Sequence, residues 1–424
     1  MDEMTLKQTD IAVYKAIQSE TRREMDNLVM IASENYASRA VIEAQANVMT
    51  NKYAEGYPAA RYYGGCEFVD KVEEIAIKRA KDLFKAEYVN VQPHSGSQAN
   101  MAVYMSFLSP GDVILGMNLA HGGHLTHGSS VSFSGMLYKG ISYGLNPRSQ
   151  LIDYDQINDL VKMHKPKMVI AGASAYPRQI DFNLFHEIAH SNGAYLMVDM
   201  AHIAGLIAAN LHPSPVGKAD FITSTTHKTL RGPRGGLILA RKEFGPKLNK
   251  GIFPGIQGGP LMHVIAAKAV SFKEAMAHNF IDYQVQVIKN AKVLADELMR
   301  LGFDLISGGT DTHLLLVDLS KMLITGQEAE RALEKVAIVA NKNSIPFDKK
   351  SPRVTSGLRL GTPALTTRGM KEPEMKIIAS IIKRVLKDPG DQVELARARN
   401  KVLEICESYP IYKGLMCDKK ENIQ

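Results

Sequence analysis

The sequence contains no tryptophan and only three cysteines, Cys66, Cys406 and Cys417, among its 424 residues. Three thiols in a chain this long give no disulfide framework, which argues against a small secreted scaffold and suits a reducing compartment. No run approaches the roughly 18 apolar residues that a membrane span requires. The first residues include Asp2 and Glu3 and lack the basic and then apolar order of a secretory signal. We therefore expect a cytoplasmic protein with no membrane-spanning segment.

The net charge of +7 is spread along the chain, and no arginine-rich stretch interleaved with aromatic residues is present. A nucleic-acid partner is therefore not expected, although a basic nucleic-acid-binding protein remains an alternative. An anionic small molecule that binds in a mildly positive cleft is a simpler explanation. The hydrophobic content of 45 % is ample for a packed interior, and the length favours two domains.

Strand-like and helix-like segments alternate through the middle of the chain. Apolar strand patterns occupy 168–174, 194–199, 220–224 and 236–240, and helical patterns occupy 71–84, where Asp70 and Glu73 are a candidate capping pair, and 182–191. This alternation predicts an α/β fold: a large domain with a mostly parallel sheet flanked by helices, plus a smaller C-terminal α+β domain. The pattern changes near Asn279. We expect an N-terminal arm over 1–30, the large domain over 31–280 and the small domain over 281–424.

The run Thr-Thr-His-Lys-Thr-Leu-Arg-Gly-Pro-Arg-Gly-Gly at 225–236 places Lys228 among cations directly after a strand-like segment. Neighbouring positive charge and partial desolvation both favour the neutral amine, which can attack a carbonyl and hold it as a Schiff base. A solvated basic loop is the alternative interpretation.

A second segment, 194–202, has the pattern of a buried strand that ends in Asp199 and is followed by His202. An aspartate at the carboxyl end of a parallel strand faces the crevice where α/β sheets bind ligands. With a Schiff-base lysine, such an aspartate forms the polar set that pyridoxal phosphate (PLP) uses, because the carboxylate keeps the pyridine nitrogen protonated. A strand-end cap with a core histidine, or a metal pair, would also fit these two residues.

A short strand, a small-residue turn and a helix follow one another over 89–108. Ser95, Gly96 and Ser97 would present backbone N–H groups and hydroxyls at the helix N-terminus, where an anion is favoured. No Walker lysine follows the glycine, which argues against a nucleoside triphosphate site. An ordinary helix cap is the alternative. His121, His124 and His127 could be a metal cluster, but the glycine-rich loop around them suits close approach to a flat ring better.

Together these segments resemble the serine hydroxymethyltransferase family, also called glycine hydroxymethyltransferase. The resemblance extends through blocks at 31–36, 51–58, 61–65, 119–128, 257–260 and 355–363, and their number, order and spacing make it specific. It implies PLP as the cofactor, tetrahydrofolate as the co-substrate, serine and glycine as substrates, and no metal.

The resemblance also implies roles for individual positions. The implied cofactor-binding residues are Tyr53, Ser95, Gly96, Ser97, His124, Ser174, Asp199, His202, Lys228, Gly258 and Gly259. The implied catalytic residues are Glu55, Tyr63, His227 and Lys228. The implied substrate-binding residues are Ser33, Tyr63, His202 and Arg359, whose planar fork suits a carboxylate. Tyr53, Tyr63, Gly258 and Gly259 would act from a neighbouring subunit, so the resemblance implies a homodimer or a dimer of dimers.

For folate, the resemblance implies a site made by Glu55, Leu119, Gly123, His124, Leu125, Asn343, Ser351, Pro352 and Arg353. Arg353 departs from the family pattern, since many relatives have phenylalanine there. Val29 is a lesser departure, where relatives commonly have glutamate, and we have no physical explanation of its effect.

The implied reaction is the reversible conversion of L-serine and tetrahydrofolate to glycine and 5,10-methylenetetrahydrofolate. A folate-independent PLP aldolase that acts on threonine or other β-hydroxy amino acids is the nearest alternative. A degenerate PLP fold kept for partner binding is a third, and the intact set of Lys228, Asp199, Arg359 and Glu55 argues against it.

Overall fold

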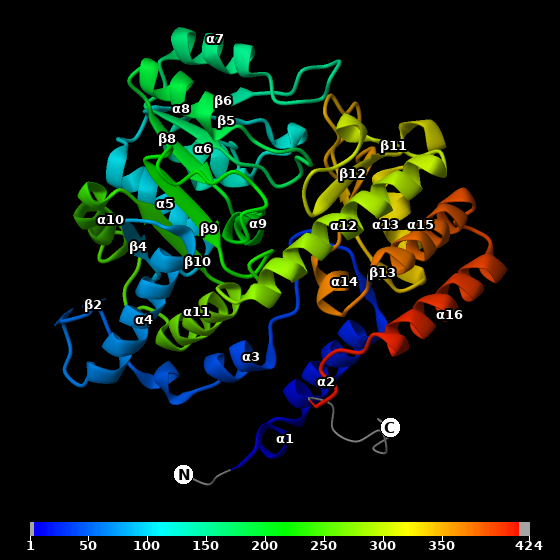
Figure 1. Ribbon diagram of the computed structural model, residues 1–424, viewed down its shortest axis with the longest axis horizontal. Helices are drawn as coiled ribbons and strands as arrows, with labels where there is room; N and C mark the ends of the chain where they lie inside the picture. Colours follow the sequence, from blue (N-terminus) through cyan, green and yellow to red (C-terminus); the bar gives the residue numbers. More distant parts are fainter. Residues whose placement is uncertain (1–3, 415–424) are drawn as a thin grey trace.

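The computed structural model describes residues 4–414, so Cys417 lies outside the described part of the chain. Its larger sheet has seven strands in the order β4-β10-β9-β8-β7-β5-β6 (Figure 1). The strands are β4 (Tyr88–Asn90), β5 (Val113–Met117), β6 (Lys139–Tyr143), β7 (Met168–Ala171), β8 (Tyr195–Asp199), β9 (Phe221–Thr225) and β10 (Gly236–Ala240). All neighbouring strands are parallel except β10, which is antiparallel to β4 and β9. The predicted mostly parallel sheet is confirmed.

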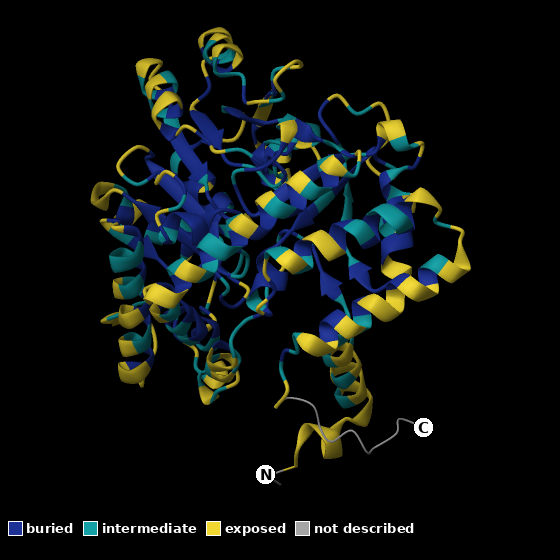
Figure 2. Cartoon of the chain, turned by 45° about the vertical axis from the view of Figure 1, so that its right-hand side comes forward, coloured by how far each residue is buried: buried dark blue, intermediate teal, exposed yellow. Residues whose placement is uncertain are grey.

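Both faces of this sheet are buried, because successive strand side chains enter two different hydrophobic clusters. In β8, Leu196 and Val198 pack into one cluster and Met197 packs into the other. Helices α4 (Glu67–Phe84), α7 (Tyr154–His164), α8 (Phe182–Ser191) and α11 (Met262–Ala275) contribute to the first cluster, and α5 (Gly96–Phe107) and α10 (Gly245–Ile252) contribute to the second. Figure 2 shows the strands buried between helices whose outer faces are exposed.

A smaller antiparallel sheet lies in the C-terminal part of the chain, with the strand order β11-β12-β15-β14. Its strands are β11 (Asp304–Leu305), β12 (Leu314–Asp318), β14 (Asn341–Asn343) and β15 (Gly357–Gly361). Helices α13 (Gly326–Lys335), α15 (Glu372–Lys387) and α16 (Gln392–Ser408) share one hydrophobic cluster with this sheet. This arrangement agrees with the predicted α+β region.

Helix α12 (His278–Arg300) joins the two sheets and contributes to both cores. Phe280 belongs to the cluster of the larger sheet, whereas Leu294 and Leu298 belong to that of the smaller one. The N-terminal segment also reaches the C-terminal part, because β1 (Leu28–Val29) pairs in parallel with β13 (Ile338–Val339). The domain boundaries expected from the sequence stay a prediction.

Helices α1 (Leu6–Thr9) and α2 (Ile11–Asp26) have no buried residue, and α2 lies beside α16 (Figure 1). The remaining elements are α3 (Arg39–Gln45), η1 (Val48–Asn51), β2 (Gly56–Tyr57), β3 (Ala60–Arg61), η2 (Leu119–His121), η3 (Leu125–His127), α6 (Phe133–Leu137), α9 (Ala204–Ala208), η4 (Lys242–Phe244), η5 (Ile306–Gly308), η6 (Ser320–Met322) and α14 (Pro363–Thr367). No helix within residues 4–414 has the length and hydropathy needed to cross a bilayer.

The predicted capping pair at the start of α4 is wrong. The helix begins at Glu67, after Cys66, which makes no side-chain cap. Asp70 and Glu73 instead bind Arg61, at 2.8 and 2.6 Å. The two carboxylates that the local spacing predicted to cap the helix therefore form ion pairs with a residue outside the helix.

Candidate active site

One cavity of about 390 Å³ opens at the carboxyl ends of the parallel strands, where α/β sheets bind ligands. Asp199 ends β8, Thr225 ends β9, Ser174 follows β7 and Ser95 follows β4. The loop after β9 adds Lys228. The predicted residues that line this cavity are Ser33, Ser95, Gly96, Ser97, His124, Ser174, Asp199, His202, His227, Lys228 and Arg359. The fold thus brings together residues that lie far apart in the sequence.

Lys228 is a lysine of the cavity whose pKa is lowered towards neutral pH. Its pKa is lowered to about 8, mainly by burial and also by the charges of Arg359 and Arg234, while Asp199 opposes the shift. At pH 7 roughly a tenth of the amine is therefore neutral, far more than at the ordinary lysine pKa, and the neutral amine is the form that attacks a carbonyl.

Asp199 is held by a network of buried side chains. Burial alone would raise its pKa, but the hydrogen bond and charge of His127 hold the pKa of Asp199 well below its usual value. His127 Nε2 lies 3.1 Å from Asp199 Oδ2, and Asn100 Nδ2 donates to the same oxygen at 2.9 Å. Thr223 Oγ1 in turn donates to Asn100 Oδ1 at 2.5 Å. Asp199 is therefore a fixed, ionised acceptor.

Three histidines of the cavity, His124, His202 and His227, are neutral near pH 7. Burial lowers the pKa of His124 to about 4 and that of His227 to about 3, and it also lowers the pKa of His202 strongly. Thr126 N–H donates to His124 Nδ1 at 3.2 Å, which fixes that imidazole ring in the cavity wall. Because these three imidazole rings carry no charge, the cavity has less positive charge than its residue types suggest.

Within residues 4–414, His124, His127 and Asp199 are the one group whose potential metal-ligand atoms lie close together, within 4.8 Å of one another. Lys228, Arg234 and Arg359 line the same cavity, and their charges disfavour a divalent cation. Asp199 Oδ2 already accepts two hydrogen bonds. These contacts favour an organic ligand that carries anionic groups.

A candidate anion cradle lies at the N-terminus of α5. Ser95 is its N-cap and its Oγ accepts from Gln98 N–H at 3.2 Å, and Gly96 and Ser97 form the first turn. Gly96 is required by close packing, because a Cβ there would lie 2.7 Å from Thr225 Cγ2. Free N–H groups and the helix dipole together favour a phosphate.

Arg359 enters the cavity from β15 of the smaller sheet. Its Nη1 donates to Ser174 O at 2.7 Å, its Nε donates to Asn341 Oδ1 at 3.2 Å, and its Nη2 lies 3.5 Å from Ser33 Oγ. Burial lowers its pKa to about 10, so it stays a cation at neutral pH. A buried guanidinium with no carboxylate partner in its hydrogen bonds is suited to bind an acidic ligand.

The other predicted cofactor and catalytic residues do not line this cavity. Tyr53 and Tyr63 are 56 % and 48 % exposed, with ring centroids 5.2 Å apart. The carboxylate of Glu55 raises the pKa of Tyr63, and a Cβ at Gly258 would lie 3.2 Å from Glu55 Oε1. Gly259 also faces Tyr53. These five residues form a second cluster at the surface, in which the tyrosines and Gly258 are exposed and Glu55 and Gly259 are half-buried. We call it the tyrosine cluster.

Apart from Glu55 in the tyrosine cluster and His124 in the cavity wall, the predicted folate positions lie in two segments that meet. Leu119 and Leu125 are exposed on the loop after β5, close to Gly123. Asn343 is half-buried in β14, and Ser351, Pro352 and Arg353 are exposed on the turn before β15. The rings of His121 and Phe347 join the two loops with their centroids 4.6 Å apart.

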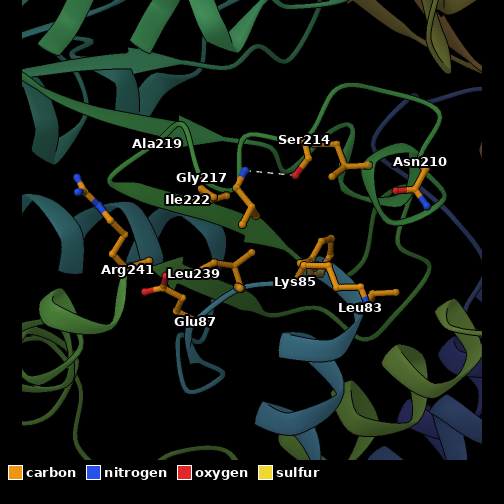
Figure 3. A pocket seen from close by; sticks show the side chains of 15 residues that line it. Leu83, Lys85, Glu87, Asn210, Ser214, Gly217, Ala219, Ile222, Leu239 and Arg241 are labelled. Carbon is orange, nitrogen blue, oxygen red and sulfur yellow. Dashed lines mark hydrogen bonds between the residues drawn. The ribbon is translucent and has the colours of Figure 1, made fainter. Parts of the chain in front are cut away.

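A larger hollow of about 690 Å³ lies at the opposite end of the sheet, between the start of β9, the end of β10 and the end of α4 (Figure 3). Three of its polar residues are already engaged: Arg241 pairs with Asp220, Ser214 Oγ accepts from Val216 N–H, and Glu87 accepts from Lys242 N–H. Its lining contains none of the predicted site residues.

Sequence reasoning left out several residues of the site. His127 belongs to the histidine cluster and Arg234 to the cationic run. Spacing alone did not show which of these histidines faces Asp199, or which of these arginines lies near Lys228. Asn100 gave no signal, since an asparagine within a helix is ordinary.

The serine hydroxymethyltransferase family model matches residues 6–382 of the chain. The match covers both sheets and every residue of the cavity. The chain therefore belongs to the serine hydroxymethyltransferase family.

Proposed function

We propose that this protein catalyses the reversible conversion of L-serine and tetrahydrofolate to glycine and 5,10-methylenetetrahydrofolate with PLP as its cofactor. Family membership supports PLP-dependent one-carbon transfer in general. The observation that carries the proposal is the meeting of Lys228, ionised Asp199 and buried Arg359 in one cavity.

The residues present fit the cofactor. Asp199 is an ionised acceptor suited to a protonated pyridine nitrogen, and the N-terminus of α5 is suited to a phosphate. His124 lies in the wall beside Asp199 and offers the flat face of a neutral ring. When bound, PLP supplies the electron sink that makes cleavage at the substrate Cα feasible.

The chain's own residues supply binding, orientation and proton control. Lys228 has the lowered pKa that covalent attachment of an aldehyde requires. Arg359 is placed to take the substrate carboxylate in exchange for its bond to Ser174 O, and Ser33 Oγ lies close to the same guanidinium. A fixed carboxylate sets which substrate bond lies perpendicular to the cofactor ring.

The proposal includes a homodimer, or a dimer of dimers, whose sites are shared. The tyrosine cluster, with Glu55 as its acid, is exposed and lies outside the cavity of its own chain. In a two-fold assembly it would complete the partner's cavity. Exposed apolar side chains on α1 and α2, among them Leu6, Ile11 and Ile17, support such an assembly. The expected cytoplasmic location rests on the sequence alone.

The test is cleavage of L-serine by the purified protein, measured with and without tetrahydrofolate as formation of methylenetetrahydrofolate and of glycine. We expect cleavage of serine that depends strongly on folate. Cleavage of threonine or other β-hydroxy amino acids at a rate indifferent to folate, with no methylenetetrahydrofolate formed, would instead support the folate-independent aldolase.

A further inference from the structure

Lys268 of α11 is a lysine buried beneath the candidate anion cradle. It is 1 % exposed, and its ammonium donates to three backbone carbonyls: Val91 O at 2.6 Å, Gly236 O at 2.9 Å and Pro93 O at 3.0 Å. All three N–H bonds are therefore used, and none goes to a carboxylate. A lysine in this environment is expensive to bury, so its position requires an explanation.

The three carbonyls belong to the two segments that flank the cradle. Val91 and Pro93 follow β4 and lead into Ser95, while Gly236 begins β10. The segments also contact each other directly, because Gly236 N–H donates to Pro93 O at 2.9 Å and a Cβ at Gly236 would lie 2.3 Å from Ser95 O. The ammonium thus holds the backbone on both sides of Ser95 in one geometry.

The charge of Lys268 is also felt at the cavity. It contributes to the lowered pKa of His94, which adjoins Ser95, and to that of His227, which lines the cavity. Burial lowers the pKa of Lys268 to about 7, and Glu73 of α4, which is itself paired with Arg61, opposes that shift. The three carbonyl acceptors match the three N–H groups of the protonated ammonium, so this geometry favours the charged form of Lys268 next to the cradle.

We propose that Lys268 is a positioning residue of the phosphate site, which holds the turn at Ser95 in shape and supplies positive potential beneath it. This inference rests on the proposed function, because it takes the anion to be the phosphate of PLP. Lys268 does not touch the anion, and it acts through the backbone of residues 91–96.

The experiment measures the dissociation constants of the cofactor-free protein for PLP and for pyridoxal, which lacks the phosphate. In Lys268→Met, which keeps most of the unbranched side chain and removes its charge, we expect the constant for PLP to rise about tenfold or more and that for pyridoxal to change less than about twofold. Lys273→Met, at an exposed position of the same helix, is the control and should leave both constants unchanged.

Lys268→Gln is the second variant, because it keeps a donor for the carbonyls without the charge, and we expect it to lose affinity for PLP selectively as well. Equal losses for PLP and pyridoxal would overturn the inference, since they would indicate a general disturbance of the cavity. Failure of both variants to fold would also overturn it, because Lys268 would then be needed for the core itself. Wild-type protein that binds neither compound would contradict the proposed function instead.

Discussion

The lowered pKa of Lys228 comes mainly from one of the two causes that its sequence context indicates. The run 225–236 pointed to neighbouring cations as well as to desolvation. In the structure burial is the largest cause of the lowered pKa, followed among the cations by Arg359, from a distant strand, and Arg234. Arg231 instead lies over the ring of Tyr283, 4.5 Å from its centroid. The lowered pKa of Lys228 therefore depends more on burial in the cavity than on the charged residues that follow it in the segment 225–236.

This origin predicts that Lys228→Met makes the cofactor-free protein more stable while abolishing turnover. The folded-state pKa of about 8 lies below the ordinary lysine value of 10.5, so burying the charged amine costs stability below pH 8. The cost shrinks as the pH rises from 8 towards 10.5, because the folded protein then releases the proton. At pH 7 we expect a gain of about 1–3 kcal/mol in the free energy of unfolding.

Urea denaturation of both proteins at pH 7 and pH 10 measures this difference, which should be smaller at the higher pH. Equal stability at pH 7 would show that the amine is solvated in the cofactor-free protein. Borohydride reduction that still fixes PLP to the variant's 225–236 peptide would contradict the role of Lys228.

At the scale of elements, strands β2 and β3 form a hairpin between Glu55 and Tyr63 of the tyrosine cluster. Buried ion pairs connect this hairpin to α4. Arg61, whose side chain is 3 % exposed, binds Glu73 and Asp70 of α4 and also donates to Ala54 O and Gly56 O. Gln92, which lies between β4 and Ser95, donates to Glu73 Oε1 at 2.8 Å. One network therefore connects the hairpin, α4 and the strand that leads into the cradle.

Glu73→Ala should destabilise the protein by about 3–5 kcal/mol, because it leaves Arg61 buried with only part of its charge compensated. Asp82→Ala on the same helix is the matched control. Asp82 pairs with Lys78 at the surface, where their side chains are 45 % and 79 % exposed, and its loss should cost less than about 1 kcal/mol. Similar unfolding free energies for the two variants would refute the structural role of the network.

The turn at 345–356 is shaped by one acidic side chain. Asp348 accepts hydrogen bonds from the backbone N–H groups of Ile345, Lys350 and Ser356 and from Ser356 Oγ. Arg353 is exposed on the same turn. If the turn binds folate through its backbone, its shape matters more than the side chain at position 353.

We therefore expect Arg353→Phe to change the Michaelis constant for tetrahydrofolate by less than about threefold, and Asp348→Ala to raise it about tenfold or more. Initial rates with monoglutamyl and polyglutamyl folate at two salt concentrations measure this. A loss of affinity in Arg353→Phe that is confined to polyglutamyl folate and greatest at low salt would show that the guanidinium binds the glutamate tail.

At the scale of the molecule, the chain presents two separated halves of the proposed site. The cavity holds Lys228 and Arg359, whereas Glu55 and the tyrosines lie in the exposed tyrosine cluster. Two chains that exchange these halves would form two complete sites.

Mixing two inactive variants tests this arrangement. Lys228→Ala and Glu55→Gln should each be inactive, but a mixed dimer contains one site in which both residues are intact. After unfolding and refolding of an equal mixture we expect about a quarter of wild-type activity, because half of the dimers are mixed and each has one working site. No recovery in refolded, dimeric protein would show that Glu55 acts in the cavity of its own chain, or that the proposed sharing is wrong.

The sequence alone determined the elements with strong periodicity and the residue types of the chemistry. Strand β8 ending at Asp199, helix α8 over Phe182–Ser191 and strand β10 over Gly236–Ala240 follow from apolar runs bounded by turn residues, which are local signals. The blocks around Lys228 and Arg359 likewise identified the family, because motif order and spacing are written in the chain.

Only the tertiary structure decided which of these residues meet. That β10 runs antiparallel to β9, that Asp70 and Glu73 bind Arg61, and that His127 and Asn100 hold Asp199 all depend on contacts between segments far apart in the chain. The burial of Lys228, which lowers its pKa, and the position of Lys268 beneath the cradle likewise arise only when the sheet and helices pack together. A local pattern specifies side chains and periodicity, but the desolvation and pairing that give those side chains their chemistry arise only on folding.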